Sequence, residues 1–300
     1  MSFAAIYVPD FVVEAVVRAE PRLHGARVAI VDGTPPLVKV VAANSKARGA
    51  GIEGGMSKPE AEAMPGLVLR PRSPALEAAT HGALLECAQA FSPRVEETAA
   101  DTLLLDLAGL EPLFGPPQKI AQELARRVRE LGLEARVAVA SNPDAAVHAA
   151  RGFPGVTFIP AGREAATLDP LPLEALFPDP HAEAVQQLLE TFDRWGVRTF
   201  RALAALPAVA LAERLGPEGL RLQTLARGAA SRPLVPVEEP LDFEESVELE
   251  HPVALLEPLA FLLNRMLERL CARRAARALA LDELTLTCEL DPIQDRKSVV

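Results

Sequence analysis

The stretch Asp101-Thr-Leu-Leu-Leu-Asp106-Leu107 decides the fold, because a short apolar run between carboxylates is typical of a buried strand. Similar short runs lie on either side of it, at Phe3–Val8, Val28–Val31, Leu37–Ala42 and Arg136–Ala140. The two valine-rich runs are separated by Asp-Gly-Thr-Pro-Pro, which predicts a strand, a loop and a second strand.

Helical segments alternate with these strands. Ser57 and Glu60 have the spacing of a capping box, with Pro59 tolerated in the first turn, so a helix is expected to begin there. Three further segments have helical composition, namely Ala75–Phe91, Pro116–Leu131 and Asp144–Ala150. The alternation predicts an α/β or α+β domain over roughly the first 160 residues.

The character of the chain changes at Pro170, where leucine, alanine and arginine begin to dominate. Breaks at Gly196, Pro207 and Gly216 predict an all-helical domain of short helices. Three prolines within 233–240 predict an extended linker. Beyond the linker we expect a strand, a long helix and a second strand, at Phe243–Leu249, Pro252–Ala276 and Leu281–Leu290. Such a unit does not easily close a core, so the last domain is expected to be truncated.

Composition excludes several classes of protein. Apolar stretches are interrupted before the ~20 residues that a membrane span needs, and the N-terminus lacks a basic signal region, so a cytoplasmic protein is expected. Cys87, Cys271 and Cys288 lie far apart without CxxC spacing, which suggests neither disulfides nor zinc.

The net charge of −10 hides two basic segments. Seven arginines stand against two glutamates between Arg194 and Arg232, and five arginines against one glutamate between Arg265 and Arg277. These segments are expected either to face phosphate or to form solvated surfaces.

Several motifs resemble those of the Y-family DNA polymerases. Ala43-Asn-Ser-Lys-Ala-Arg48-Gly-Ala-Gly51-Ile52 resembles their fingers motif, and Pro21-Arg-Leu-His-Gly25 resembles the segment that leads from the fingers helix into its strand. The stretch at Asp101 is similar to their palm motif. The segments around Gly196 and Gly216 resemble a helix-hairpin-helix thumb. In such a thumb, glycine lets the backbone approach DNA phosphates, and the exposed amides at the start of the next helix can hydrogen-bond them.

The resemblance implies an α+β multidomain fold with a palm, fingers, a thumb and a partial α/β little finger. We expect the palm and fingers to span 1–165, with the fingers at about 11–73 inserted in the palm. The helical thumb would span 166–232, the linker 233–242 and the truncated little-finger domain 243–300.

The resemblance also implies that the catalytic metal site is degenerate. The family holds two magnesium ions with three carboxylates, because paired ions stabilise the attacking and leaving oxygens. Alignment places Tyr7 and Thr102 where two of these carboxylates belong, and only Asp101 remains. Asp10 could replace the lost ligand if the alignment slipped. Asp106 is not expected to help, because its odd spacing from Asp101 points it to the opposite face of a strand.

The nucleotide pocket is expected to be degenerate as well. Val12 replaces an aromatic steric gate, Ser45 replaces a tyrosine, and Ala145 replaces a lysine that binds triphosphate. Arg48 is expected to be either a remnant of the nucleotide site or a structural ion pair. No catalytic residue, metal or other cofactor is therefore predicted.

This combination resembles the ImuB type of the family, which implies a non-catalytic adaptor in a damage-induced mutasome. Implied partners are DNA, the sliding clamp, a RecA-related ImuA-like protein and an error-prone replicative-type polymerase, within a bacterial nucleoid. The DNA contacts are predicted at Gly196, Arg198, Thr199, Gly216 and Arg221. The alternatives are a divergent but active polymerase that uses magnesium, and a helical scaffold that does not bind DNA.

Overall fold

Five strands form the palm sheet, with β1 at its centre and the strand order β5-β6-β1-β7-β8. Their bounds are β1 (Phe3–Tyr7), β5 (Val95–Ala99), β6 (Thr102–Asp106), β7 (Arg136–Ala140) and β8 (Val156–Phe158). All neighbours are antiparallel except β7 and β8, which are parallel.

The computed structural model describes residues 2–230, 232–237, 247, 253, 255–275 and 283–287.

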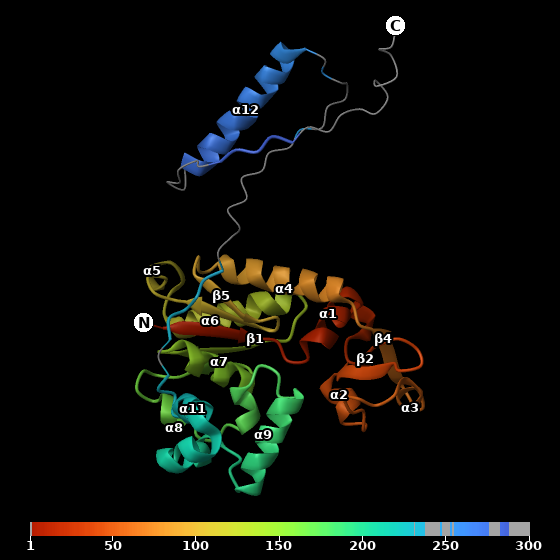
Figure 1. Cartoon of the computed structure of the whole chain (residues 1–300), viewed down its shortest axis with the longest axis vertical. Helices are drawn as coiled ribbons and strands as arrows, with labels where there is room; N and C mark the ends of the chain where they lie inside the picture. Colours follow the sequence, from red (N-terminus) through yellow and green to blue (C-terminus); the bar gives the residue numbers. More distant parts are fainter. Residues whose placement is uncertain are drawn as a thin grey trace. The chain divides into compact units, whose positions relative to one another are not determined.

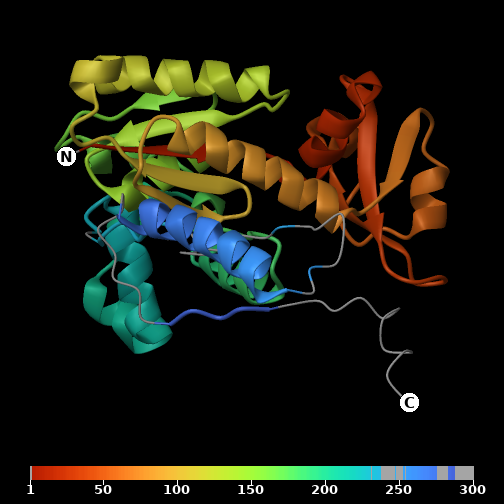
Figure 2. The same cartoon turned by 90° about the horizontal axis from the view of Figure 1, so that it is seen from above.

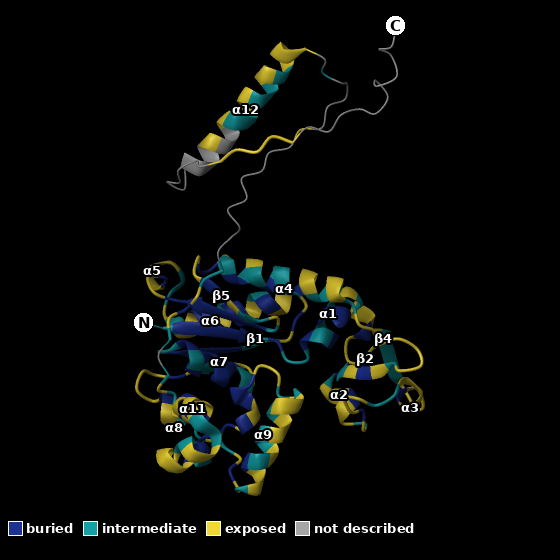
Figure 3. Cartoon of the chain, in the orientation of Figure 1, coloured by how far each residue is buried: buried dark blue, intermediate teal, exposed yellow. Residues whose placement is uncertain are grey.

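Both faces of the palm sheet are covered, because successive side chains of a strand point to opposite faces. Ala4 and Ile6 of β1 pack into one hydrophobic cluster with α4 (Pro74–Gln89) and α6 (Pro117–Glu130). Phe3 and Ala5 pack into a second cluster with α7 (Pro143–Gly152). Figure 3 shows β1 buried between these layers.

A smaller sheet forms the fingers, with the strand order β3-β2-β4. Its strands are β2 (Arg27–Asp32), β3 (Lys39–Ala43) and β4 (Leu67–Pro71), and its helices are α1 (Phe11–Ala19), η1 (Pro21–Leu23), α2 (Ser45–Arg48) and α3 (Lys58–Glu62). The capping box at Ser57 and Glu60 is confirmed. Figures 1 and 2 show the fingers beside the palm.

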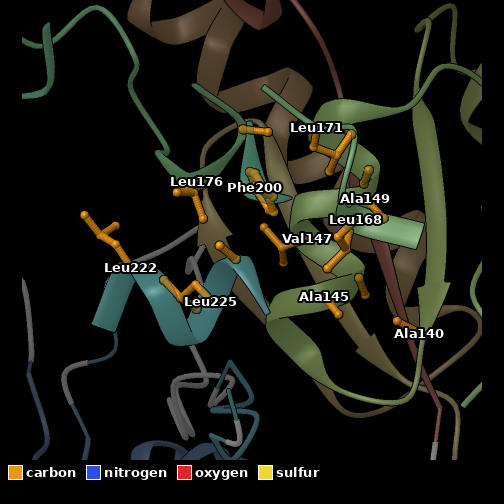
Figure 4. Close-up of a cluster of buried hydrophobic side chains, with 14 of the residues drawn as sticks. Ala140, Ala145, Val147, Ala149, Leu168, Leu171, Leu176, Phe200, Leu222 and Leu225 are labelled. Atoms are coloured by element: carbon orange, nitrogen blue, oxygen red, sulfur yellow. The ribbon is translucent and has the colours of Figure 1, made fainter. Parts of the chain in front are cut away.

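Short helices form the thumb, namely α8 (Glu164–Leu168), η2 (Leu173–Leu176), α9 (Glu183–Arg194), α10 (Phe200–Ala204) and α11 (Ala208–Ala226). Gly216 interrupts α11 with a φ of 63°. The thumb shares a core with the palm, because Phe200, Leu222 and Leu225 pack with Val147 and Ala149 of α7 (Figure 4). The thumb helices therefore pack on the face of the palm sheet toward which Phe3 and Ala5 point.

The segment after the thumb returns to the palm. Arg232 donates to both carboxylate oxygens of Glu96 and to Asp144, and Val237 N donates to Val95 O at 2.7 Å. Arg232 therefore forms part-buried ion pairs within the first unit, which corrects the expectation that it faces phosphate or lies on a solvated surface. The first compact unit ends here, at Val237, and the second spans Glu238–Val300.

The second unit contains the expected long helix, α12 (Leu256–Ala275). The strand expected at Leu281–Leu290 is wrong for its described part, because 283–287 has no regular structure. The strand expected at Phe243–Leu249 lies outside the described residues except for Val247. No helix among the described residues is long and apolar enough to cross a membrane.

Candidate functional site

Three residues form a row across neighbouring strands of the palm sheet. Tyr7 is the register partner of Thr102 on β6 and of Arg136 on β7. Register partners lie on the same face of a sheet, so the three side chains share the face that α7 covers. The structure therefore brings together Tyr7, Thr102 and the neighbouring Asp101, the three positions at which the sequence predicted a degenerate metal site.

Asp101 is tied to this row through hydrogen bonds. The Thr102 hydroxyl donates to Asp101 Oδ1 at 2.6 Å, and Arg151 Nη2 donates to Thr102 Oγ1 at 3.4 Å. Arg151 lies in the last turn of α7, where Arg136 Nη1 donates to its carbonyl oxygen at 2.8 Å. The Arg136 guanidinium also stands 5.9 Å from the centre of the Tyr7 ring. Arg151 and Arg136 thus place two cations beside Tyr7 and Thr102.

Burial governs the electrostatics of the site. Desolvation raises the pKa of Asp101, and the Thr102 hydrogen bond and the charge of Arg151 only partly oppose it. Desolvation also raises the pKa of Tyr7, with a further contribution from Asp101, so the phenol is neutral near pH 7. The pKa of Arg151 is lowered by its own desolvation.

The other two acidic candidates are engaged elsewhere. Both carboxylate oxygens of Asp10 accept from Arg48, at 2.7 and 3.0 Å, in an ion pair that links the start of α1 to α2. Asp106 lies at the far end of β6, opposite Phe3, and pairs with Arg94 at 2.6 Å.

These donors do not fit a two-metal site. Hard cations such as Mg²⁺ prefer carboxylate ligands. Asp101, Tyr7 and Thr102 supply one carboxylate, a neutral phenol and a hydroxyl that already donates to that carboxylate. Nearby guanidinium groups add positive charge, which opposes the binding of a cation. Throughout the described ranges, no cluster of three or more His, Cys, Asp or Glu side chains could hold a metal ion.

The positions of the predicted nucleotide pocket lie on separate elements. Val12 packs partly buried in the fingers core on α1, and Ser45 is the exposed first residue of α2. Ala145 is 0% exposed within the core that the palm and thumb share. Arg48 is engaged with Asp10, so its predicted role as a nucleotide-binding remnant stays a prediction.

The predicted DNA contacts lie on the thumb. Gly196 follows α9 with a φ of 75°, and Gly216 has a φ of 63°; a Cβ at either position would meet open space. Both turns therefore need glycine for its positive φ rather than for close internal packing. Exposed Arg198 and Arg221 form ion pairs with Asp193 and Glu218.

One expectation about the first thumb hairpin is wrong. The amides at the start of α10 do not stay open for phosphate, because Phe200 N donates to Leu171 O at 2.9 Å and Arg201 N to Asp169 O at 3.1 Å. The third amide, Ala202 N, donates to the Thr199 hydroxyl, so Thr199 caps the helix.

Sequence reasoning missed Arg136 and Arg151. Arg136 begins one predicted element and Arg151 directly follows another, but only the register between β1 and β7 and the packing of α7 bring both to Tyr7. The sequence did contain a signal for both residues. An arginine next to an otherwise apolar strand or helix usually needs an acidic partner when it is buried.

The arrangement of palm, fingers and thumb is the fold of Y-family polymerases. DinB from Sulfolobus solfataricus matches with a TM-score of 0.65 and 20% identity, over 78% of this chain and 69% of that chain. A post-insertion binary complex of Dbh DNA polymerase matches with a TM-score of 0.63 at 19% identity, covering the same shares of the two chains.

Residues 6–151 match the model of the impB/mucB/samB family. Protein ImuB from Caulobacter vibrioides is 30% identical over 213 residues, which are 71% of this chain and 45% of that protein. DNA polymerase IV from Ralstonia nicotianae is 31% identical over 79% of this chain and 65% of its own length. The chain is thus consistent with an ImuB-type, Y-family-like protein, and it spans under half of the Caulobacter relative.

Proposed function

We propose that this chain is a non-catalytic adaptor in translesion synthesis, which binds DNA and recruits an error-prone polymerase in bacterial cells. The observation that carries the proposal is the row of Tyr7, Thr102 and Arg136 on the palm sheet. Polymerase chemistry needs two metal ions held by carboxylates, and of the three predicted metal-site positions Tyr7, Asp101 and Thr102 only Asp101 is a carboxylate. Similarity to ImuB supports the same function.

DNA binding by the thumb forms the first part of the proposal. Two glycine turns and the exposed Arg198 and Arg221 give a surface suited to the sugar-phosphate backbone rather than to base edges. Binding should therefore depend steeply on salt, with little preference for sequence. It should also be the same in EDTA and in Mg²⁺, apart from ionic strength, because no step needs a bound metal.

Recruitment forms the second part. By resemblance, the partners are a sliding clamp, a RecA-related protein of the ImuA type and a replicative-type polymerase. A pull-down of these three proteins with the full chain, and with a version extended beyond Val300, tests it. Capture of the polymerase by either version supports the adaptor, whereas failure of both to capture any of the three contradicts recruitment.

An active but divergent polymerase is the alternative, favoured by the similarity to several proteins named DNA polymerase IV. It requires Asp101 to hold magnesium together with Asp10. The bidentate ion pair between Asp10 and Arg48 argues against it, because that carboxylate already has a charged partner. A DNA-independent scaffold would instead show no salt-dependent affinity for DNA.

A further inference from the structure

A lone, largely buried carboxylate needs a compensating positive charge. Removing one from water costs several kcal/mol unless hydrogen bonds or a cation offset the loss. Asp101 is in this position, because burial raises its pKa and, among the described residues, Arg151 opposes this through its charge without forming a salt bridge to the carboxylate. Other groups in the fold must therefore compensate the charge of Asp101.

The hydroxyl of Thr102 bridges the carboxylate to a guanidinium. A threonine hydroxyl has one proton to donate and two lone pairs that accept. Thr102 gives its proton to Asp101 Oδ1 at 2.6 Å and accepts from Arg151 Nη2 at 3.4 Å. The directions of the two hydrogen bonds agree with the charges, because the guanidinium donates, the carboxylate accepts and the neutral hydroxyl does both.

Arg151 is a largely desolvated cation at a helix end. Its Nε is buried and has no hydrogen-bond partner among the described residues, and its carbonyl oxygen accepts from Arg136. It also lies in the last turn of α7, where the helix dipole favours a cation. Arg151 gives up hydration at this site, which is a cost that an exposed arginine would avoid.

We infer that the Arg151 guanidinium serves as the palm's own fixed cation for Asp101, coupled to it through the Thr102 hydroxyl. This inference rests on the proposed non-catalytic function, in which Thr102 stands at the position of a lost metal ligand, and it deepens that proposal. The remnant of the metal site has become a metal-independent structural element. Two other charges also act at this site. Arg136 lies beside Tyr7, and the charge of Asp179 raises the pKa of Asp101.

A double-mutant cycle on the full chain tests the inference. Arg151→Met and Asp101→Asn should each lower Tm by about 3 °C or more, because each leaves the other group buried without its partner. The double variant should lose clearly less than the sum of the two losses. Thr102→Val should weaken this coupling and Thr102→Ser should keep it. Should Arg151→Met fail to fold, Arg151→Lys, which keeps the charge, replaces it in the cycle and should show a smaller loss.

Two results would overturn the inference. The first is additive losses in the cycle. The second is a rise in the Tm of the native chain with Mn²⁺ that Asp101→Asn abolishes, because Asp101 would then be a metal ligand. Additive losses without primer extension would remove this inference alone, whereas primer extension together with a coupled cycle would remove the proposed function alone.

Discussion

Tyr7 stands directly opposite Thr102 in the register of β1 and β6, so the two positions at which the sequence predicts lost metal ligands lie side by side. Restoring two carboxylates by Tyr7→Asp with Thr102→Glu should not restore a polymerase. Val12, Ser45 and Ala145 would still lack the groups that hold a nucleotide, and Arg136 and Arg151 would still oppose a metal ion. Primer extension checks this prediction, and incorporation by the double variant would contradict it.

The ion pair between Arg232 and Glu96 should stabilise the whole first unit. The Glu96 side chain is 10% exposed and also accepts from Val235 N, so Arg232→Ala leaves a nearly buried carboxylate without its cation. We expect a loss of about 2 kcal/mol in the free energy of unfolding. Arg198→Ala is the matched control, because its ion pair with Asp193 is exposed and should contribute under about 1 kcal/mol. Equal losses in urea unfolding would contradict this difference.

The thumb arginines should contribute to DNA affinity without selecting a sequence. Arg198→Ala and Arg221→Ala should each weaken binding and lower the salt slope by about 1. Arg126→Ala serves as the control, because Arg126 is also exposed and ion-paired but lies on α6 of the palm. Fluorescence anisotropy on several duplexes measures these effects. A loss confined to one sequence, or an equal loss in the control, would argue against backbone contacts.

Burial of His148 should make the first unit sensitive to acid. Desolvation lowers its pKa to about 4, with smaller effects from Arg151 and Arg221 that Asp144 opposes. The unfolded chain, with a histidine pKa of about 6.5, then binds the proton more readily than the folded chain. The stability from the neutral imidazole is complete above pH 6.5 and decreases as pH falls to 4, by up to about 3 kcal/mol.

The matched variant is His148→Gln, which removes this titration while keeping a polar side chain. Its free energy of unfolding should fall less steeply between pH 6.5 and 4 than that of the native chain. Parallel pH profiles for the two proteins would show that His148 does not carry the effect.

The sequence predicted the central elements better than their edges. β1, β6 and β7 follow from uninterrupted apolar runs, because central strands are buried on both faces. β4, β5 and β8 were not predicted, and all three are edge strands whose half-exposed residues weaken the pattern. The sequence also did not predict that the segment after the thumb contacts β5. Its prolines indicated an extended linker and gave no indication of the ion pair between Arg232 and Glu96.

Within the candidate site, motif order identified Tyr7, Asp101 and Thr102, and the strand register confirms that they lie together. Sequence spacing could not identify Arg151, because its approach to Thr102 depends on how α7 packs on the sheet. The open amides expected at α10 were wrong because the preceding Leu171 and Asp169 supply carbonyl acceptors. Local motifs report on local geometry, and tertiary contacts decide which polar groups stay free.

Primer extension by the native chain tests the central claim most directly. A labelled primer annealed to a template is incubated with the chain, all four dNTPs and either Mg²⁺ or Mn²⁺, with Asp101→Ala alongside and DNA binding measured in the same buffer. We expect the chain to bind the duplex and leave the primer unextended with either metal. Incorporation that Asp101→Ala abolishes would contradict the account, because it would make Asp101 a working metal ligand and the chain a polymerase.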